Sequence, residues 1–386
     1  MKTIKKLLLA LVVSGITLLL AIIGAEIYLR KKEVTTVTSY TAELYTHDGR
    51  KVSLPVGQFK LALAPFTIFQ NLPSQHTEKF NINSRGLRDD ERGEQDSRPK
   101  VIFLGGSAAF GQGAATDSDT IPAILGQSIN SHRFVNAGVI GFQSGQELTF
   151  LVTDLIDYEP AIVIAYDGWN DVYDGARSPH RGVHKLGFNN NFFKLEDELV
   201  GNYRTQLSSS ASLSRLLETS TRRSLVLRQF SQAISTHQIQ SRIQTIRDLP
   251  EAGQKDLIDR IVATYVNNVR KMAVFSQASG AKFLLVFQPE LGQRTNPTSE
   301  ERKLLSSMKV GDTSYDFFPA LYRQFLSAAK LLLTQEGVAW IDVNENSLFQ
   351  TDPQTLFEDP VHTNRRGNEI AAQTIAERLL PLFERK

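Results

Sequence analysis

A serine on a glycine-rich turn is the first residue of this chain whose setting suggests chemistry. Val101 to Leu104 is a short apolar run that leads into GGSAAFGQG, which places Ser107 on a tight turn. In open α/β sheets, ligands bind beyond the carboxyl ends of the strands, where such a turn exposes a hydroxyl and a backbone N–H. A Walker phosphate loop does not fit, because Gln112 stands where that motif needs lysine. Small residues also occur at such turns for packing alone.

An acid and an imidazole near the C-terminus form the second candidate group. Asp359 and His362 lie three positions apart in EDPVHTNRRG, so on a helical turn they would share one face. Of the 7 histidines, only His362 has an acidic residue three positions before it. An oriented imidazole can accept the proton of a serine hydroxyl, which is otherwise a poor nucleophile. Taken alone, this motif is more often a surface Asp-His pair with no function.

Two further residues could stabilise the negative charge that forms when a serine attacks an ester. Preorganised N–H donors contribute roughly 3 to 4 kcal/mol each to such a transition state. Gly138, in NAGVIGF, can bring its backbone N–H close to a substrate, and Asn170, in YDGWNDV, offers a side-chain amide. An ordinary turn glycine and a capping asparagine are the competing interpretations.

The residues around Asn170 are also conspicuous. Trp169 and Tyr173 could line a sugar or acyl pocket, or could pack the wall of the crevice. Asp167 and Asp171 raise the possibility of a metal site or a second acid. Because no cluster with metal-ligand spacing accompanies them, we expect both to be solvated turn residues. The mechanism suggested by these motifs needs no metal and no cofactor.

Short apolar runs and helical patterns alternate along the body of the chain. Such alternation is typical of a three-layer, doubly wound, flavodoxin-like α/β sandwich with a central parallel sheet of about five strands. The expected strands are Val101 to Leu104, Phe134 to Ala137, Ala161 to Tyr166, Lys282 to Phe287 and Val338 to Val343. Helices are expected over residues 256 to 279, ending before Gly280, and from about Asn368 to the end of the chain.

Three regions follow from this organisation. Residues 7 to 25 are an uncharged apolar run of the length needed to cross a membrane as a helix, so residues 1–32 are expected to form a signal anchor. Residues 33–98 are expected to be a linker and N-terminal extension. Residues 99–386 are expected to be the main α/β domain, with an inserted helical subdomain at 185–250. Basic residues flank the apolar run on both sides and leave the orientation nearly tied.

Composition removes several classes of function. Lys and Arg number 43 against 41 Asp and Glu, and no long basic block follows the apolar run, so nucleic acid is not an expected partner. The chain has 0 cysteines, which excludes disulfides, thiolate metal sites and a cysteine nucleophile.

The ordered set of motifs resembles the SGNH (GDSL-like) hydrolase family. The serine block reads GGSAAFG, which is similar to a membrane-anchored subgroup with a GGSxxFG form, and Asn83, Gly86 and Arg88 in FNINSRGLR are similar to the same subgroup. The residues that match the family are Ser107, Gly138, Asn170, Asp359 and His362.

The resemblance implies a membrane-anchored serine esterase whose catalytic domain lies outside the cytoplasmic membrane. It implies a triad of Ser107, Asp359 and His362, with an oxyanion hole formed by Ser107, Gly138 and Asn170. The expected substrate is a carboxylic ester, such as an O-acetyl group on a glycan or a small or lipid ester. The alternatives are an O-acyltransferase acting on an exported polysaccharide with the same residues, and a non-catalytic, glycan-binding SGNH scaffold.

Overall fold

The computed structural model describes residues 59–91, 96–177, 246–307 and 313–384, with the shorter pieces 17, 23–25, 42–45, 51–52 and 309–310. The chain divides into two compact units. One comprises Met1–Ala42, Pro55–Gln58 and Asn191–Ile243, and the other comprises Glu43–Leu54, Phe59–Asn190 and Gln244–Lys386. Every residue discussed as a site below belongs to the second unit.

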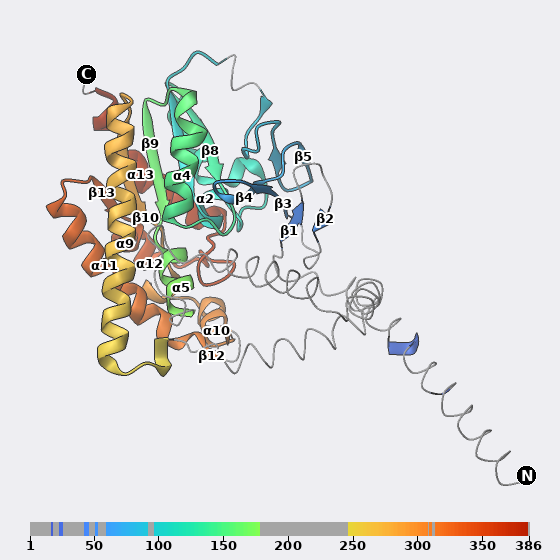
Figure 1. Ribbon diagram of the computed structural model, residues 1–386, viewed down its shortest axis with the longest axis vertical. Helices are drawn as coiled ribbons and strands as arrows, with labels where there is room; N and C mark the ends of the chain where they lie inside the picture. Colours follow the sequence, from blue (N-terminus) through green and yellow to red (C-terminus); the bar gives the residue numbers. More distant parts are fainter. Residues whose placement is uncertain are drawn as a thin grey trace, which may run out of the picture. The chain divides into compact units, whose positions relative to one another are not determined.

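A five-stranded parallel sheet forms the centre of the second unit (Figure 1). Its strands are β7 (Lys100–Gly105), β8 (Arg133–Gly138), β9 (Ile162–Asp167), β10 (Lys282–Phe287) and β13 (Trp340–Asp342). They lie in the order β13-β10-β9-β7-β8, and all neighbouring pairs are parallel. Numbered along the chain from the β8 edge, this order is 2-1-3-4-5, the flavodoxin-like arrangement. The predicted α/β fold with a five-stranded parallel sheet is therefore confirmed.

Helices cover both faces of the sheet, because alternate strand residues point to opposite sides. On one face, Val101 and Phe103 of β7 share a core with Leu125 and Ile375, which belong to α3 (Ile121–Ser128) and α13 (Arg365–Glu384). On the other face, α4 (Ser144–Thr153) and α11 (Phe318–Gln335) pack along the long helix α9 (Glu251–Ala278). Figure 1 shows α9 running the length of the sheet.

Shorter elements complete the unit. The ones nearest the site are α2 (Ser107–Phe110) and α5 (Trp169–Arg177), which begin directly beyond the ends of β7 and β9. Further elements are α10 (Ser299–Ser307), the hairpin of β11 (Lys309–Val310) and β12 (Thr313–Ser314), and α12 (Ser347–Thr351).

The N-terminal extension contains antiparallel strands, and part of it packs against α2. It comprises β1 (Ala42–Tyr45), β2 (Lys51–Val52), β3 (Phe59–Ala64), β4 (Ile68–Asn71), β5 (Gln75–His76) and β6 (Asn81–Ile82). Phe59, Phe80 and Ile82 bury their side chains against Phe110 of α2. Part of the region expected to be a linker and N-terminal extension, residues 33–98, is thus packed against the start of the domain expected at 99–386.

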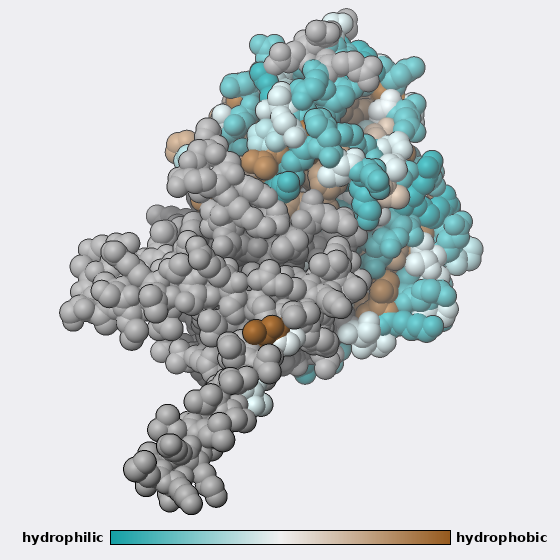
Figure 2. Space-filling model, turned by 90° about the vertical axis from the view of Figure 1, so that its right-hand side faces the viewer, coloured by the Kyte–Doolittle hydropathy of each residue, from teal (hydrophilic) through white to brown (hydrophobic). Residues whose placement is uncertain are grey.

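Two predicted segments fall outside the described residues. The helical insert at 185–250 does so except for residues 246–250, and the anchor at 1–32 does so except for Thr17 and residues 23–25. Within the parts of the chain that the structure describes, none of the helices has the length and apolar character required to span a membrane. The described surface in Figure 2 is mainly hydrophilic, and its hydrophobic residues are scattered.

Candidate active site

Three side chains form one hydrogen-bonded chain, although one of them is more than 250 positions away from the other two in the sequence. The Oγ atom of Ser107 lies 2.7 Å from Nε2 of His362, and Nδ1 of His362 lies 2.6 Å from Oδ2 of Asp359. Ser107 is half-buried and His362 is 8% exposed. The residues predicted from the sequence as nucleophile, base and acid are therefore within direct hydrogen-bonding reach of one another.

The loop before α13 holds the acid and the imidazole in place. The spacing of Asp359 and His362 suggested a shared helical turn, but the structure has no helix there. They lie in a bend closed by an antiparallel bridge between Phe357 and Thr363. The Oδ1 atom of Asp359 accepts the backbone N–H groups of Val361 and His362, both at 2.9 Å. One carboxylate oxygen thus shapes the loop while the other orients the imidazole.

The ionisation of Asp359 suits its place beside His362. Burial raises the pKa of the Asp359 carboxyl, but the adjacent imidazole and the two backbone N–H donors outweigh that effect. The net result is a pKa below its usual value. Asp359 is therefore ionised at neutral pH and can stabilise a positively charged imidazole next to it.

The turn at the end of β7 leaves the Ser107 backbone N–H available. Ser107 is the first residue of α2, so its N–H has no acceptor within the helix. Gly106 precedes it, and a Cβ atom there would lie 2.6 Å from Nδ2 of Asn170 and 3.1 Å from the carbonyl oxygen of Phe142. The amide of Asn170 and the backbone around Phe142 therefore lie directly against the serine turn.

Asn170 is positioned by one of its own hydrogen bonds. Its Nδ2 atom donates to the carbonyl oxygen of Phe142 at 2.7 Å, which uses one of its two N–H bonds. The second remains for an oxygen at the serine turn. The predicted proximity of Asn170 and Ser107 is thus present in the structure.

Gly138 does not fit the oxyanion role suggested by the sequence. Its backbone N–H donates to Oδ1 of Asn136 at 3.0 Å, and a Cβ atom at Gly138 would lie 2.2 Å from the backbone nitrogen of Phe110. Gly138 is packed between β8 and α2, and its only backbone N–H is already hydrogen-bonded to Asn136. Its small size serves this close packing rather than access to a substrate.

Gly141, which the sequence reasoning missed, is a better backbone donor in the same loop. It has a φ of 81° and lies in the tight turn closed by the hydrogen bond from Phe142 N to Val139 O. Gly141 is half-buried, and among the described residues no acceptor is recorded for its N–H. A glycine three positions before the start of a helix in NAGVIGFQS was the available sequence signal, because a left-handed turn residue favours glycine.

A buried carboxylate fastens this loop to α5. Oδ1 of Asp171 accepts the Ser144 hydroxyl at 2.6 Å and Oδ2 accepts the Ser144 backbone N–H at 3.0 Å, at the first turn of α4. The side chains of Asn170 and Asp171 therefore both bind the segment 142–144, one on each side of Gln143. These hydrogen bonds of Asn170 and Asp171 hold α5 at a fixed distance from the turn that contains Gly141.

The expectation that Asp167 and Asp171 are solvated is wrong. They are 4% and 3% exposed, respectively, and Glu147 beside them is fully buried. Burial raises the pKa of Asp171 to about 7, and burial together with the nearby Asp167 raises the pKa of Glu147 well above its usual value. Tyr265 donates its hydroxyl to Asp167. Within the described residues, no group of three or more His, Asp or Glu side chains has the geometry of a metal site.

Trp169 and Tyr173 belong to an aromatic cluster beside the site. Trp169 is 3% exposed, and its ring lies 5.3 to 5.9 Å from the rings of Tyr173, Tyr315, Phe318 and Tyr322. Tyr173 is half-buried. Trp169 thus packs the wall under Asn170 in the described structure, and contact of Tyr173 with a substrate stays a prediction.

Comparison with known proteins yields similarity only at the level of solved structures. No protein-family model matches the chain, and no curated protein matches it. A GDSL-like lipase from Bacteroides thetaiotaomicron is 13% identical, with a TM-score of 0.38, 75% of this chain covered and 95% of that chain covered. An acetyl xylan esterase is 14% identical, with a TM-score of 0.39 and coverage of 72% and 99%.

A psychrotrophic esterase from Pseudoalteromonas sp. is similar to the same extent. It is 12% identical, with a TM-score of 0.38, 74% of this chain covered and 99% of that chain covered. The structures that this fold resembles thus include GDSL-like hydrolases. At such identities and TM-scores the likeness carries no argument about activity, so the function rests on the geometry of the site.

Proposed function

We propose that this protein hydrolyses carboxylic esters with Ser107 as the nucleophile. The observation that carries the proposal is the continuous chain from Ser107 Oγ through the His362 ring to Asp359, with distances of 2.7 and 2.6 Å. A serine hydroxyl becomes an effective nucleophile when an oriented imidazole accepts its proton as the new bond forms.

The proposed reaction proceeds in two acyl-transfer steps. His362 Nε2 takes the proton of Ser107 Oγ, which attacks the ester carbonyl carbon and gives a tetrahedral intermediate. His362 then donates this proton to the departing alcohol oxygen, leaving an acyl-serine. Water attacks the acyl-serine, with its proton passing to His362, and the acid leaves as the Ser107 oxygen regains a proton.

The negative charge on the carbonyl oxygen is placed among three donors in this proposal. They are the backbone N–H of Ser107, the second Nδ2 hydrogen of Asn170, and the backbone N–H of Gly141 in place of Gly138. Donors fixed before the reaction do not have to reorganise as the charge develops, which makes them effective in a partly buried site.

Covalent labelling tests the nucleophile directly. We expect a fluorophosphonate probe to label the wild-type protein, and the same preparation to hydrolyse an aryl acetate. Ser107→Ala should abolish the labelling and lower turnover by a factor on the order of 10³ or more. Labelling that persists in Ser107→Ala at the wild-type rate would refute the assignment.

For the substrate, we propose an O-acetyl group on a glycan. The support is the GGSAAFG block and the resemblance of its setting to anchored SGNH members. Acetate release from an acetylated glycan should exceed release of a long-chain acid from the matching ester. A preference for the long-chain ester would instead assign the site to lipids.

A further inference from the structure

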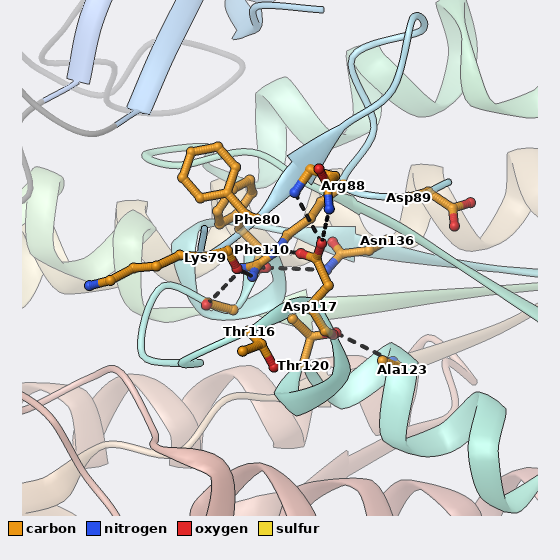
Figure 3. Close-up of polar contacts among 12 residues, drawn as sticks. Lys79, Phe80, Arg88, Asp89, Phe110, Thr116, Asp117, Thr120, Ala123 and Asn136 are labelled. Carbon is orange, nitrogen blue, oxygen red and sulfur yellow. Dashed lines mark hydrogen bonds and ion pairs between the residues drawn. The ribbon is translucent and has the colours of Figure 1, made fainter. Parts of the chain in front are cut away.

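A buried arginine from the N-terminal extension closes the C-terminal end of the nucleophile helix. The side chain of Arg88 is 2% exposed. Its Nη1 atom donates to the carbonyl oxygens of Phe110 and Gly111, both at 2.9 Å (Figure 3). Carbonyls at a helix C-terminus lack partners within the helix, and a positive charge is favourable there. Asn136 Nδ2 also donates to the Phe110 carbonyl at 3.2 Å and Ala114 N to the Gly111 carbonyl at 3.0 Å, so Arg88 supplies the charged donor shared by both.

The other atoms of the guanidinium hold two further segments. Nη2 donates to the carbonyl oxygen of Lys79 at 3.0 Å, and Nε donates to Oδ1 of Asp117 at 2.8 Å (Figure 3). The carbon of the guanidinium lies 4.8 Å from the ring centre of Phe110 and 5.8 Å from that of Phe80. Arg88 therefore joins the extension, α2 and the 3₁₀ turn Asp117–Asp119 at a single point.

Asp117 makes the burial of this charge tolerable. A buried guanidinium is strongly unfavourable without a partner, and removal of one member of such a pair leaves the other uncompensated. The second oxygen of Asp117 accepts from the backbone and the side chain of Asn81, at 3.0 and 2.9 Å. The ion pair is thereby fixed to strand β6 on its far side.

The preceding turn is built to deliver Arg88 to this position. Oδ1 of Asn83 accepts the backbone N–H groups of Arg85 and Leu87, both at 3.0 Å. Gly86 between them has a φ of 80°, and a Cβ there would lie 3.0 Å from the carbonyl oxygen of Asn71. The Arg88 backbone N–H then bonds Asn136 O at 3.2 Å. The segment FNINSRGLR thus ends in a hydrogen-bonded turn that places the Arg88 side chain at the C-terminal end of α2.

We propose that Arg88 is a positioning residue for Ser107, and this proposal rests on the function proposed above. A helix of four residues has little stability of its own, so the position of α2 depends on what holds its ends. The carbonyl oxygen of Ser107 accepts the N–H groups of Gly111 and Gln112, both at 3.0 Å, so a shift at the Arg88 end reaches Ser107. Displacing a reacting group by about 1 Å can cost about 10²-fold in rate.

Replacement of Arg88 by methionine, with a matched control, tests the proposal. Arg133 is the control, because it is also buried and ion-paired, to Asp89 and Asp90, but stands at the start of β8, away from the carboxyl ends of the strands. Each variant is assayed with an aryl acetate at a temperature where circular dichroism shows it to be folded. Arg88→Met should lower kcat about 10- to 100-fold with KM within about threefold of wild type. Arg133→Met should lose stability but keep kcat within about threefold.

Two further measurements separate positioning from general stability. Arg88→Lys keeps a donor for the α2 carbonyls and should recover part of the lost kcat. Hydrogen exchange at the Gly111 and Gln112 amides should be faster in folded Arg88→Met and unchanged in folded Arg133→Met. This readout does not need turnover, so it remains informative if Ser107→Ala shows that the proposed function is wrong.

Wild-type kcat in folded Arg88→Met, or an equal loss of kcat in Arg133→Met, would overturn the proposal. Should Arg88→Met fail to fold, Asp117→Asn decides the question. The Asp117 side chain is 40% exposed, and its substitution removes the charge that holds Arg88. Folded Asp117→Asn should lose about 3- to 10-fold in kcat through the displaced guanidinium, and an unchanged kcat would contradict the positioning role.

Discussion

At the scale of single residues, the two oxygens of Asp359 have separate tasks. Oδ1 accepts two backbone N–H groups and shapes the loop, while Oδ2 binds the His362 ring. Asp359→Asn can keep the first task, but its amide N–H would oppose the ring N–H and favour the wrong tautomer. We expect kcat for an aryl acetate to fall about 10²- to 10⁴-fold. Glu358→Gln, at an exposed neighbour, is the control and should leave kcat unchanged.

Asn170 gives a second prediction at this scale. Asn170→Ala removes the amide that lies against Gly106 and should lower kcat about 10²- to 10³-fold with a small effect on KM, because the lost donor acts mainly in the transition state. Asn130→Ala, at an exposed site before β8, serves as the control in the same assay. A loss confined to KM would show that Asn170 binds the ground state instead.

Ser107, Asn170, Asp359 and His362 could be predicted from the sequence because their residue types and their positions after strands are both informative. The choice between Gly138 and Gly141 could not, since it depends on which N–H Asn136 accepts. The burial of Asp167 and Asp171 could not be predicted from the sequence either, because helices distant in the sequence enclose them.

At the scale of elements, apolar content located the central strands well. Val101 to Leu104 was expected and Lys100–Gly105 is observed, because a parallel strand buried on both faces is a continuous apolar run. At the sheet edge, Val338 to Val343 was expected and only Trp340–Asp342 is paired. The short strands of the extension gave little signal, because Phe59 and Phe80 are buried by each other, by Ile82 and by Phe110, and Phe110 lies in a different part of the sequence.

Asp171, which joins α5 to α4, makes the free energy of unfolding depend on pH. Burial raises the pKa of Asp171 from 3.8 to about 7 in the folded protein. The folded state then keeps a proton that the unfolded state has lost. The stabilisation is thus complete below about pH 4 and is lost as pH rises through about 7.

Asp171→Asn isolates this effect, since asparagine does not titrate. Between pH 4 and 8, the free energy of unfolding of the wild type should fall relative to the variant by a few kcal/mol, at about 1.4 kcal/mol per pKa unit. Urea unfolding over a pH series measures it, with Asp256→Asn at an exposed position on α9 as the control. Parallel curves for the wild type and Asp171→Asn would show that Asp171 is ionised throughout.

At the scale of the whole molecule, strand order explains how residues 255 positions apart meet. Because β7 and β9 are neighbours at the point where the strand order reverses, the turns after them place Ser107 and Asn170 side by side. The loop before α13 then brings His362 to the same edge of the sheet. This convergence was predictable, because the carboxyl ends of parallel strands share one edge. The contribution of the extension through Arg88 was not, since it depends on packing outside the sheet.

The attachment of the protein is a proposal at the same scale. The uncharged apolar run at residues 7 to 25 should hold the full chain in the membrane, with the catalytic domain extracytoplasmic. The full chain should therefore stay in the membrane pellet after a carbonate wash and dissolve only in detergent. A variant of residues 33–386 should be soluble and keep kcat for an aryl acetate within about threefold, because the described site residues all lie beyond residue 59.

Protease added to intact spheroplasts should digest the domain of the full chain. Recovery of the full chain in the soluble fraction would disprove the anchor, and protection from protease would reverse its orientation.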